Sequence, residues 1–195
     1  MNALGLGALL VATPVLAQTR LGVHAGGTLA SALVRDSIVQ PLTLRSAPGP
    51  GVRFTLDTQL SPVYQAGVSL ATTWGPLRER TPDASRDVVH LASWHPAVTL
   101  RRRIGAALSA WASAGAIMYR PDRSAGTLFA QGAPIVPVLG LGVGLARPLG
   151  GNLALVLDAG YDVHRFTTTT LRDAGFIGER VVHRVVVSLG VTRSL

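Results

Sequence analysis

The sequence predicts an all-β fold, an eight-stranded antiparallel up-and-down transmembrane β-barrel. Three observations support this fold class. Apolar residues alternate with small or polar residues along most of the chain, the alternation occurs in eight separate segments, and the connections between the segments are alternately long and short. An even number of strands with every second connection short places all the short turns at one end of the barrel.

The alternation is clearest near the C-terminal end of the chain. In segment 153–163 the odd positions are mostly large and apolar, whereas the even positions include Asp158, Gly160 and Asp162. Segment 181–191 repeats this pattern. Because successive side chains of a strand point to opposite faces, the pattern predicts strands that separate an apolar exterior from a narrow interior filled by small and polar side chains.

Eight such segments divide the chain. We expect strands at 19–32, 49–59, 63–78, 87–101, 104–119, 133–147, 152–167 and 180–193. The connections at 33–48, 79–86, 120–132 and 168–179 are long, and those at 60–62, 102–103 and 148–151 are short. Pro, Gly, Ser and Asp are frequent in the long connections, as is typical of loops.

Composition narrows the function classes. A chain of 195 residues, 48% hydrophobic and 14% charged, fits one domain. All 18 basic residues are arginine and the net charge is +8, but the arginines are scattered and no nucleic-acid-binding motif accompanies them, so we expect no nucleic-acid partner. The absence of cysteine excludes disulfides, thiolate metal sites and cysteine nucleophiles.

The N-terminal segment 1–17 is typical of a secretory signal peptide. It contains an apolar stretch at 3–12 and a small residue, Ala17, at the expected cleavage position before Gln18. The segment is shorter than the roughly 20 apolar residues that a membrane-spanning helix needs. We therefore expect cleavage between Ala17 and Gln18 and a single barrel domain over 18–195.

With its eight alternating strands and unequal loops, the chain over 18–195 resembles the small outer-membrane β-barrel family, the OmpA/OmpX-like eight-stranded barrel domains. The resemblance implies a Gram-negative cell outer membrane as the location, with short periplasmic turns and longer extracellular loops. It also implies contact with outer-membrane lipid and lipopolysaccharide, insertion by the barrel-assembly machinery, and a monomer. Such barrels usually end in an aromatic residue, whereas this chain ends in Leu195 and carries Arg193 near it.

Five charged residues fall on the inner face by the alternation. We expect Arg53, Asp57, Asp158, Asp162 and Arg184 to form a polar network that fills the interior, because a buried charge is costly unless it is paired. Since segments 152–167 and 180–193 are neighbours, a charge-assisted hydrogen bond between Asp162 and Arg184 is expected. The other interpretation of these charges is a gated ion path or a proton relay, although an eight-stranded interior is too narrow for a permanent pore.

No catalytic, cofactor-binding or metal-binding residue is predicted. The five histidines are dispersed, with His24, His95 and His164 facing inward by the alternation. The middle of segment 104–119 places Trp111 inward as well. Aromatic residues near strand ends are predicted to form the interfacial girdles of a membrane barrel, and these are Tyr64, Trp74, Trp94, Tyr119, Tyr161 and Phe166.

These observations predict a non-catalytic barrel that stabilises the cell envelope or presents its loops for surface interaction. One alternative is a soluble periplasmic lipocalin-like barrel, whose apolar face would line a ligand site. Another is a lipid-modifying outer-membrane enzyme that uses a His, a Ser and an acid. A soluble barrel would need a strongly polar outer face, and the face opposite the apolar one carries mainly Gly, Ala, Ser and Thr.

Overall fold

The computed structural model describes residues 19–36, 42–122, 134–169, 173 and 180–195. The predicted signal peptide at 1–17 and its cleavage site between Ala17 and Gln18 lie outside the described residues. Within the described residues, no helix has the length and hydrophobicity needed to cross a membrane.

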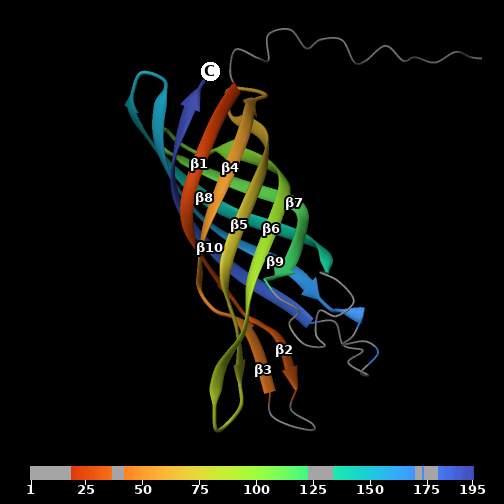
Figure 1. Cartoon of the computed structure of the whole chain (residues 1–195). Helices are drawn as coiled ribbons and strands as arrows, with labels where there is room; N and C mark the ends of the chain where they lie inside the picture. The colour runs from red at the N-terminus through yellow and green to blue at the C-terminus, as the bar shows by residue number, and fades with distance from the viewer. Residues whose placement is uncertain (1–18, 37–41, 123–133, 170–172, 174–179) are drawn as a thin grey trace, which may run out of the picture.

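Eight long strands form a closed antiparallel barrel (Figure 1). The strands are β1 (Thr19–Ala30), β4 (Gly49–Gln59), β5 (Tyr64–Arg80), β6 (Ser85–Arg103), β7 (Leu108–Pro121), β8 (Ile135–Gly150), β9 (Leu153–Phe166) and β10 (Arg180–Ser194). Their order around the barrel is β5-β4-β1-β10-β9-β8-β7-β6, and pairing between β5 and β6 closes the sheet. The predicted eight-stranded antiparallel barrel is confirmed.

The predicted loop at 33–48 is wrong in part, because it contains two short strands. β2 (Ala32–Asp36) pairs with β3 (Leu42–Ser46), and β3 pairs with the distal end of β5, from Thr43 opposite Arg80 to Ser46 opposite Leu77. Leu33 and Val34 are buried in an apolar cluster, which explains why this segment folds back against the barrel.

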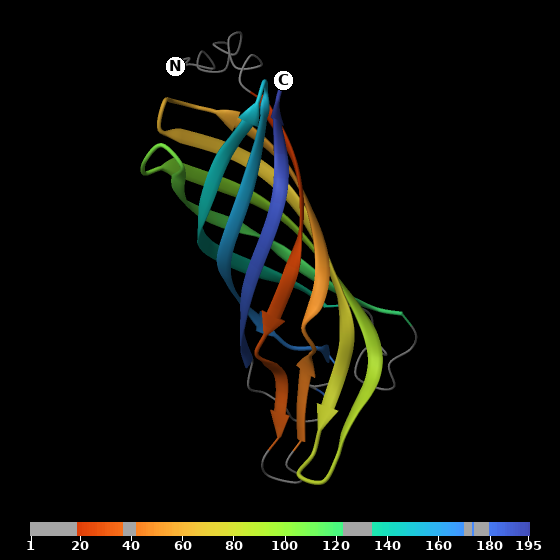
Figure 2. The same cartoon turned by 90° about the vertical axis from the view of Figure 1, so that its left-hand side faces the viewer.

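The two hairpins β2–β3 and β5–β6 project beyond the barrel, at the end opposite the C-terminus (Figure 2). β5 and β6 have 17 and 19 residues, more than the roughly 10 that a membrane-spanning strand needs. We call this projecting sheet the paddle, which consists of β2, β3, Leu77–Arg80 of β5 and Ser85–Val89 of β6.

The turn between β6 and β7 also differs from the prediction, which placed it at 102–103. Arg101 pairs with Trp111 and Arg103 with Ser109, so both strands continue past the predicted turn. The chain reverses through 104–107 instead, and β7 begins at Leu108. Arg101 and Arg103 lie on the inner face and Arg102 on the outer face, so the three arginines alternate as residues of a strand do.

The outer surface of the barrel is apolar. Leucine and valine side chains at alternate positions of β8, β9 and β10 are exposed, with Leu141 63% exposed and Leu157 42% exposed. Away from the paddle end, the inner positions of the same strands are mostly glycines and buried polar residues such as Asp158 and Ser188. A soluble lipocalin-like barrel has the opposite arrangement, so the structure contradicts that alternative.

One end of the interior is filled by a hydrophobic cluster, which lies at the paddle end of the barrel. Its members are Ala30, Leu33, Val34, Leu77, Val89, Leu91, Ile117, Tyr119, Val136, Val138, Phe166 and Val182. Ile117 and Val182 have no exposed surface. Because the cluster receives inward side chains from most of the barrel strands, it closes the interior at this end.

The predicted aromatic girdle is correct for some residues and wrong for two. Tyr64, Trp74, Trp94 and Tyr161 are exposed on the outer face. Tyr119 and Phe166 instead point inward and are buried, with their rings packed edge to face at a centroid distance of 5.3 Å. Both positions have the inward parity of their strands, and the hydrophobic cluster gives these large rings an apolar environment.

The apolar outer face predicts a depth-dependent cost for charge. Leu157→Arg in the middle of β9 is expected to lower the free energy of unfolding by about 2–4 kcal/mol, because a guanidinium there faces lipid. Ile104→Arg, in the exposed β6–β7 turn, serves as a control and is expected to cost about 0–1 kcal/mol. Reversible unfolding of both variants in lipid bilayers measures the difference. Equal costs at the two positions would contradict the assignment of the outer face.

Candidate functional site

The interior below the hydrophobic cluster contains a cavity of about 420 Å³. All eight barrel strands contribute lining residues, and so do the short turns, through Ala106, Ala107, Gly151 and Asn152. The cavity therefore reaches the short-turn end of the barrel, while the hydrophobic cluster closes the paddle end. We call it the lumen cavity.

Asp158 of β9 is the centre of the polar network around the lumen cavity. Its side chain is almost fully buried, and both terminal nitrogens of Arg101 donate to its carboxylate at 3.1 Å. Arg53 of β4 donates to the same carboxylate. Asp158 thus joins three strands that are not neighbours in the sheet, and two guanidinium groups neutralise one buried carboxylate.

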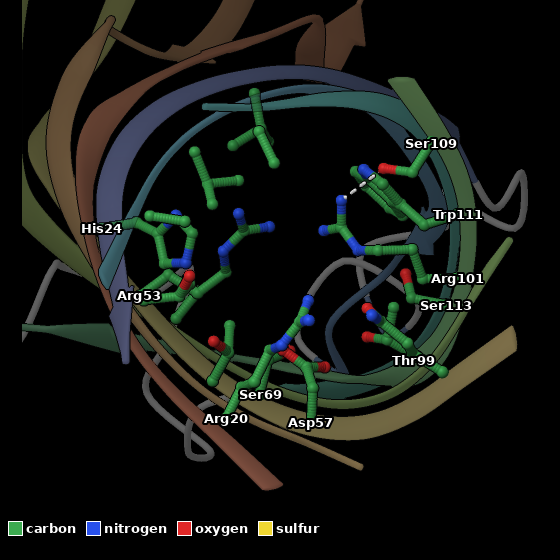
Figure 3. Close-up of a pocket in the computed structure, with 18 of the residues that line it drawn as sticks. Arg20, His24, Arg53, Asp57, Ser69, Thr99, Arg101, Ser109, Trp111 and Ser113 are labelled. Carbon is green, nitrogen blue, oxygen red and sulfur yellow. Dashed lines mark hydrogen bonds between the residues drawn. The ribbon is translucent and has the colours of Figure 1, made fainter. Parts of the chain in front are cut away.

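Serine hydroxyls hold the two arginines in place. Arg101 donates to Oγ of Ser109 at 2.9 Å, and Arg53 donates to Oγ of Ser188 at 3.1 Å. Figure 3 shows the side chains of Arg53 and Arg101 extending into the cavity from opposite walls. Arg101 was not among the residues predicted for this network, although its parity matches that of His95 and Thr99 on the same strand.

Glycines on β8 and β9 make room for this network. A Cβ atom at Gly144 would contact both Arg101 and Asp158, and one at Gly160 would lie 2.5 Å from ring carbons of Trp111. Trp111 points inward as predicted and is buried. Glycine at the inner positions Gly140, Gly142 and Gly144 of β8 therefore has a physical reason: the opposing side chains occupy the space.

Asp162 and Arg184 are directly opposite each other in the β9–β10 register. Both side chains are buried, yet among the described residues no nitrogen of Arg184 lies within 4.0 Å of Asp162, so the predicted hydrogen bond is absent. Register fixes the backbone positions of the two residues, but it does not fix where the longer arginine side chain ends. Nδ1 of His95 is instead 3.9 Å from Asp162.

Asp57, the remaining predicted residue, also lines the cavity. It is opposite Arg20 of β1 and Gly67 of β5 in register. In the described part of the chain, no ion pair within 4.0 Å involves Asp57. The structure therefore brings Arg53 and Asp158 together, and it places Asp57, Asp162 and Arg184 around the same cavity without joining them.

The histidines separate as the alternation predicts. His24, His95 and His164 face inward, whereas His90 and His183 are exposed on the outside. Nε2 of His164 lies 2.6 Å from the hydroxyl of Tyr119. Across the described ranges, no group of three His, Asp or Glu side chains could hold a metal ion.

Comparison with known proteins identifies the fold. No protein-family model matches the chain, and no curated protein matches its sequence. Solved structures do match: the outer-membrane protein AlkL has a TM-score of 0.57 at 12% identity, over 90% of this chain and 89% of that one. OprG of Pseudomonas aeruginosa has a TM-score of 0.55 at 8% identity, over 92% and 96%. Neisserial surface protein A has a TM-score of 0.50 at 17% identity, over 91% and 97%.

The chain has the fold of the small outer-membrane β-barrels. The similarity covers nearly the full length of both chains in each comparison, so this outer-membrane barrel fold accounts for the described residues as a whole. Its apolar exterior is the surface that such a barrel presents to lipid. The fold and this surface together support the predicted location in the cell outer membrane.

The network predicts strong coupling between Arg53 and Asp158. Asp158→Asn leaves two half-buried guanidinium groups without their carboxylate and is expected to cost about 3–5 kcal/mol, while adding Arg53→Gln costs less than the sum. The control is the cycle of Asp162→Asn with Arg184→Gln, where no ion pair joins the two side chains and the coupling is smaller. Unfolding in bilayers gives both couplings. Larger coupling in the control cycle would contradict this assignment.

The glycines opposite Trp111 give a second test. Gly160→Ala is expected to destabilise the barrel by about 1–3 kcal/mol because the added methyl group overlaps the Trp111 ring. Trp111→Leu in the same chain removes the overlap and recovers part of the loss. Gly105→Ala is the matched control, since a Cβ atom there meets nothing within 4 Å. Equal destabilisation by Gly160→Ala in both backgrounds would show that the ring and the glycine are not in contact.

Proposed function

We propose that this barrel is a non-catalytic outer-membrane protein with a structural and surface-interaction role and no permanent pore. The observation that carries the proposal is the pair of side-chain clusters that lie across the interior. The hydrophobic cluster closes the paddle end, and the contacts of Asp158 with Arg53 and Arg101 cross the space below it. An eight-stranded interior filled in this way supports rigidity rather than conduction.

The paddle supports a surface role because it lies beyond the part of the barrel that needs lipid. Ion pairs stabilise it: Arg78 donates to Asp87 at 2.7 Å and Arg86 donates to Glu79 at 2.7 Å. The hydrogen bond from Arg78 holds the pKa of the exposed Asp87 carboxyl below its ordinary value. The pair therefore contributes at neutral pH and is lost as the pH falls through the pKa of Asp87.

Further arginines at this end face outward without an acidic partner. In the described parts of the chain, no ion pair within 4.0 Å is formed by Arg45, Arg80 or Arg120. Arg120 of β7 lies two residues beyond Met118, which pairs with the exposed Trp94, so it is just above the aromatic girdle. This is the level of lipid headgroups, where a guanidinium can bind phosphate oxygens in a bidentate manner.

The proposed partner of this arginine level is lipopolysaccharide, whose phosphate groups lie at the outer surface of the outer membrane. The barrel is proposed to act as a monomer and to be inserted by the barrel-assembly machinery, despite ending in Leu195. The backbone amide of Leu195 donates to the carbonyl of Thr19 at 2.9 Å, so the last residue is attached to β1 without an aromatic side chain.

Replacement of Arg120 tests the proposed partner. Arg120→Gln is expected to weaken the binding of the folded, detergent-solubilised barrel to immobilised lipopolysaccharide by about 1 kcal/mol, roughly fivefold, and the loss should shrink at high salt. Arg147→Gln, an exposed arginine near the short-turn end, is the control and should leave the affinity unchanged. Equal effects of the two substitutions would mean that binding reflects net charge alone and would overturn the proposal.

A further inference from the structure

The lumen cavity has an excess of cationic groups. Its lining includes the arginines Arg20, Arg53, Arg101, Arg103 and Arg184. The carboxylates in the lining are Asp57 and Asp162, and the carboxylate of Asp158 lies behind it, bound to two of the arginines. The cavity therefore carries a net positive charge within a barrel whose exterior is apolar, which strengthens its attraction for an anion.

Several hydrogen-bond donors around the cavity have no partner. Among the described residues, Nη1 of Arg184, Nε of Arg53 and Nε1 of Trp111 are buried and make no hydrogen bond. Arg184 is only 5% exposed. Each of these three groups can donate and none can accept, which adds to the cationic, donor-rich character of the cavity wall.

The arginines converge on the same space. Figure 3 shows the side chains of Arg20, Arg53 and Arg101 pointing into the cavity from three different strands. Arg53 and Arg101 are already held by Asp158, whereas Arg20 forms no ion pair within 4.0 Å in the described part of the chain. The ring of Trp111 supplies an apolar surface on one side of the cavity.

We propose that the lumen cavity binds a small organic oxyanion, a carboxylate or phosphate ester that carries an apolar group. The anionic end accepts hydrogen bonds from Arg20, beside Arg53 and Arg101, and the apolar group lies against Trp111. The volume of 420 Å³ is within the roughly 300–1,000 Å³ of small-molecule sites. The ligand enters from the short-turn end and leaves by the same route, because the hydrophobic cluster closes the other end.

Fluorescence of Trp111 gives a direct test. The chain has three tryptophans, so Trp74→Phe with Trp94→Phe leaves Trp111 alone to report on the cavity. Phenyl phosphate is the probe, added to the folded barrel in detergent micelles. The expected result is a saturable change in Trp111 emission, with little change when phenol, the uncharged analogue, is used. The absence of a saturable response to phenyl phosphate would overturn the proposal.

Removal of single arginines distinguishes binding of the anion in the cavity from its attraction to the overall positive charge of the barrel. In the same background, Arg20→Gln is expected to raise the dissociation constant for phenyl phosphate about tenfold, the loss expected for one charge-assisted hydrogen bond. Arg102→Gln is the matched control, because Arg102 is at the same end but faces outward over the ring of Tyr64. An unchanged dissociation constant in Arg20→Gln, or an equal increase in both variants, would overturn the proposal.

A second measurement does not require the loss of any arginine. Because the chain has no cysteine, Ala71→Cys introduces a single thiol into the cavity lining. We expect an anionic methanethiosulfonate reagent to modify it faster than a cationic one, and phenyl phosphate to slow that reaction. If the two reagents react at equal rates and phenyl phosphate does not slow the reaction, the interior is polar but holds only water, and the proposal is overturned. Both measurements are made without lipopolysaccharide, so their outcome is independent of lipopolysaccharide binding.

Discussion

The narrow interior of an eight-stranded barrel is the constraint on which the rest of this structure depends. Because the sheet is closed, the backbone groups that would otherwise form an open edge are paired, which lets an apolar exterior face lipid. The same closure confines the inner side chains to a space only a few residues wide. Glycines therefore occupy inner positions wherever a large side chain crosses from the opposite wall, as Trp111 does above Gly160.

The interior changes from polar to apolar along the barrel axis, because different side chains fit at its two ends. At the short-turn end the interior is polar, and Asp158 is stabilised by Arg53 and Arg101 rather than by water. At the paddle end the inner positions become apolar and β2 adds Leu33 and Val34. The two halves of the interior differ in polarity although they belong to one sheet. The lumen cavity therefore reaches the short-turn end, and the apolar cluster lies at the other end.

Much of this architecture could be predicted from the sequence, because side-chain alternation is a local property of strands. It assigned the eight barrel strands and the inward direction of His24 and Trp111 correctly. It missed β2 and β3 because five-residue strands give too few repeats to be recognised beside Pro and Gly. It also missed the contact between Arg101 and Asp158, since β6 and β9 are not neighbours and no register relates them.

The error over Asp162 and Arg184 has a different cause. The sequence predicted the two residues about one rung apart and the structure places them on the same rung, but register does not determine where a long side chain ends. The girdle prediction for Tyr119 and Phe166 was wrong because position near a strand end was given more weight than parity. Alternation identified the inner face, whereas the contacts made there depend on side-chain length and on the opposite wall.

The pairing of β1 with β10 has a consequence for how the chain reaches this state. The eleven paired positions run from Arg20 with Ser194 to Ala30 with Arg184, so the seam joins the two strands that are farthest apart in sequence. Each intermediate sheet has two unpaired edges until the last strand arrives, and loop closure over nearly the whole chain makes that step slow. The barrel is therefore complete only when the final strand is in place, and a chain shortened before β10 has no alternative seam to close.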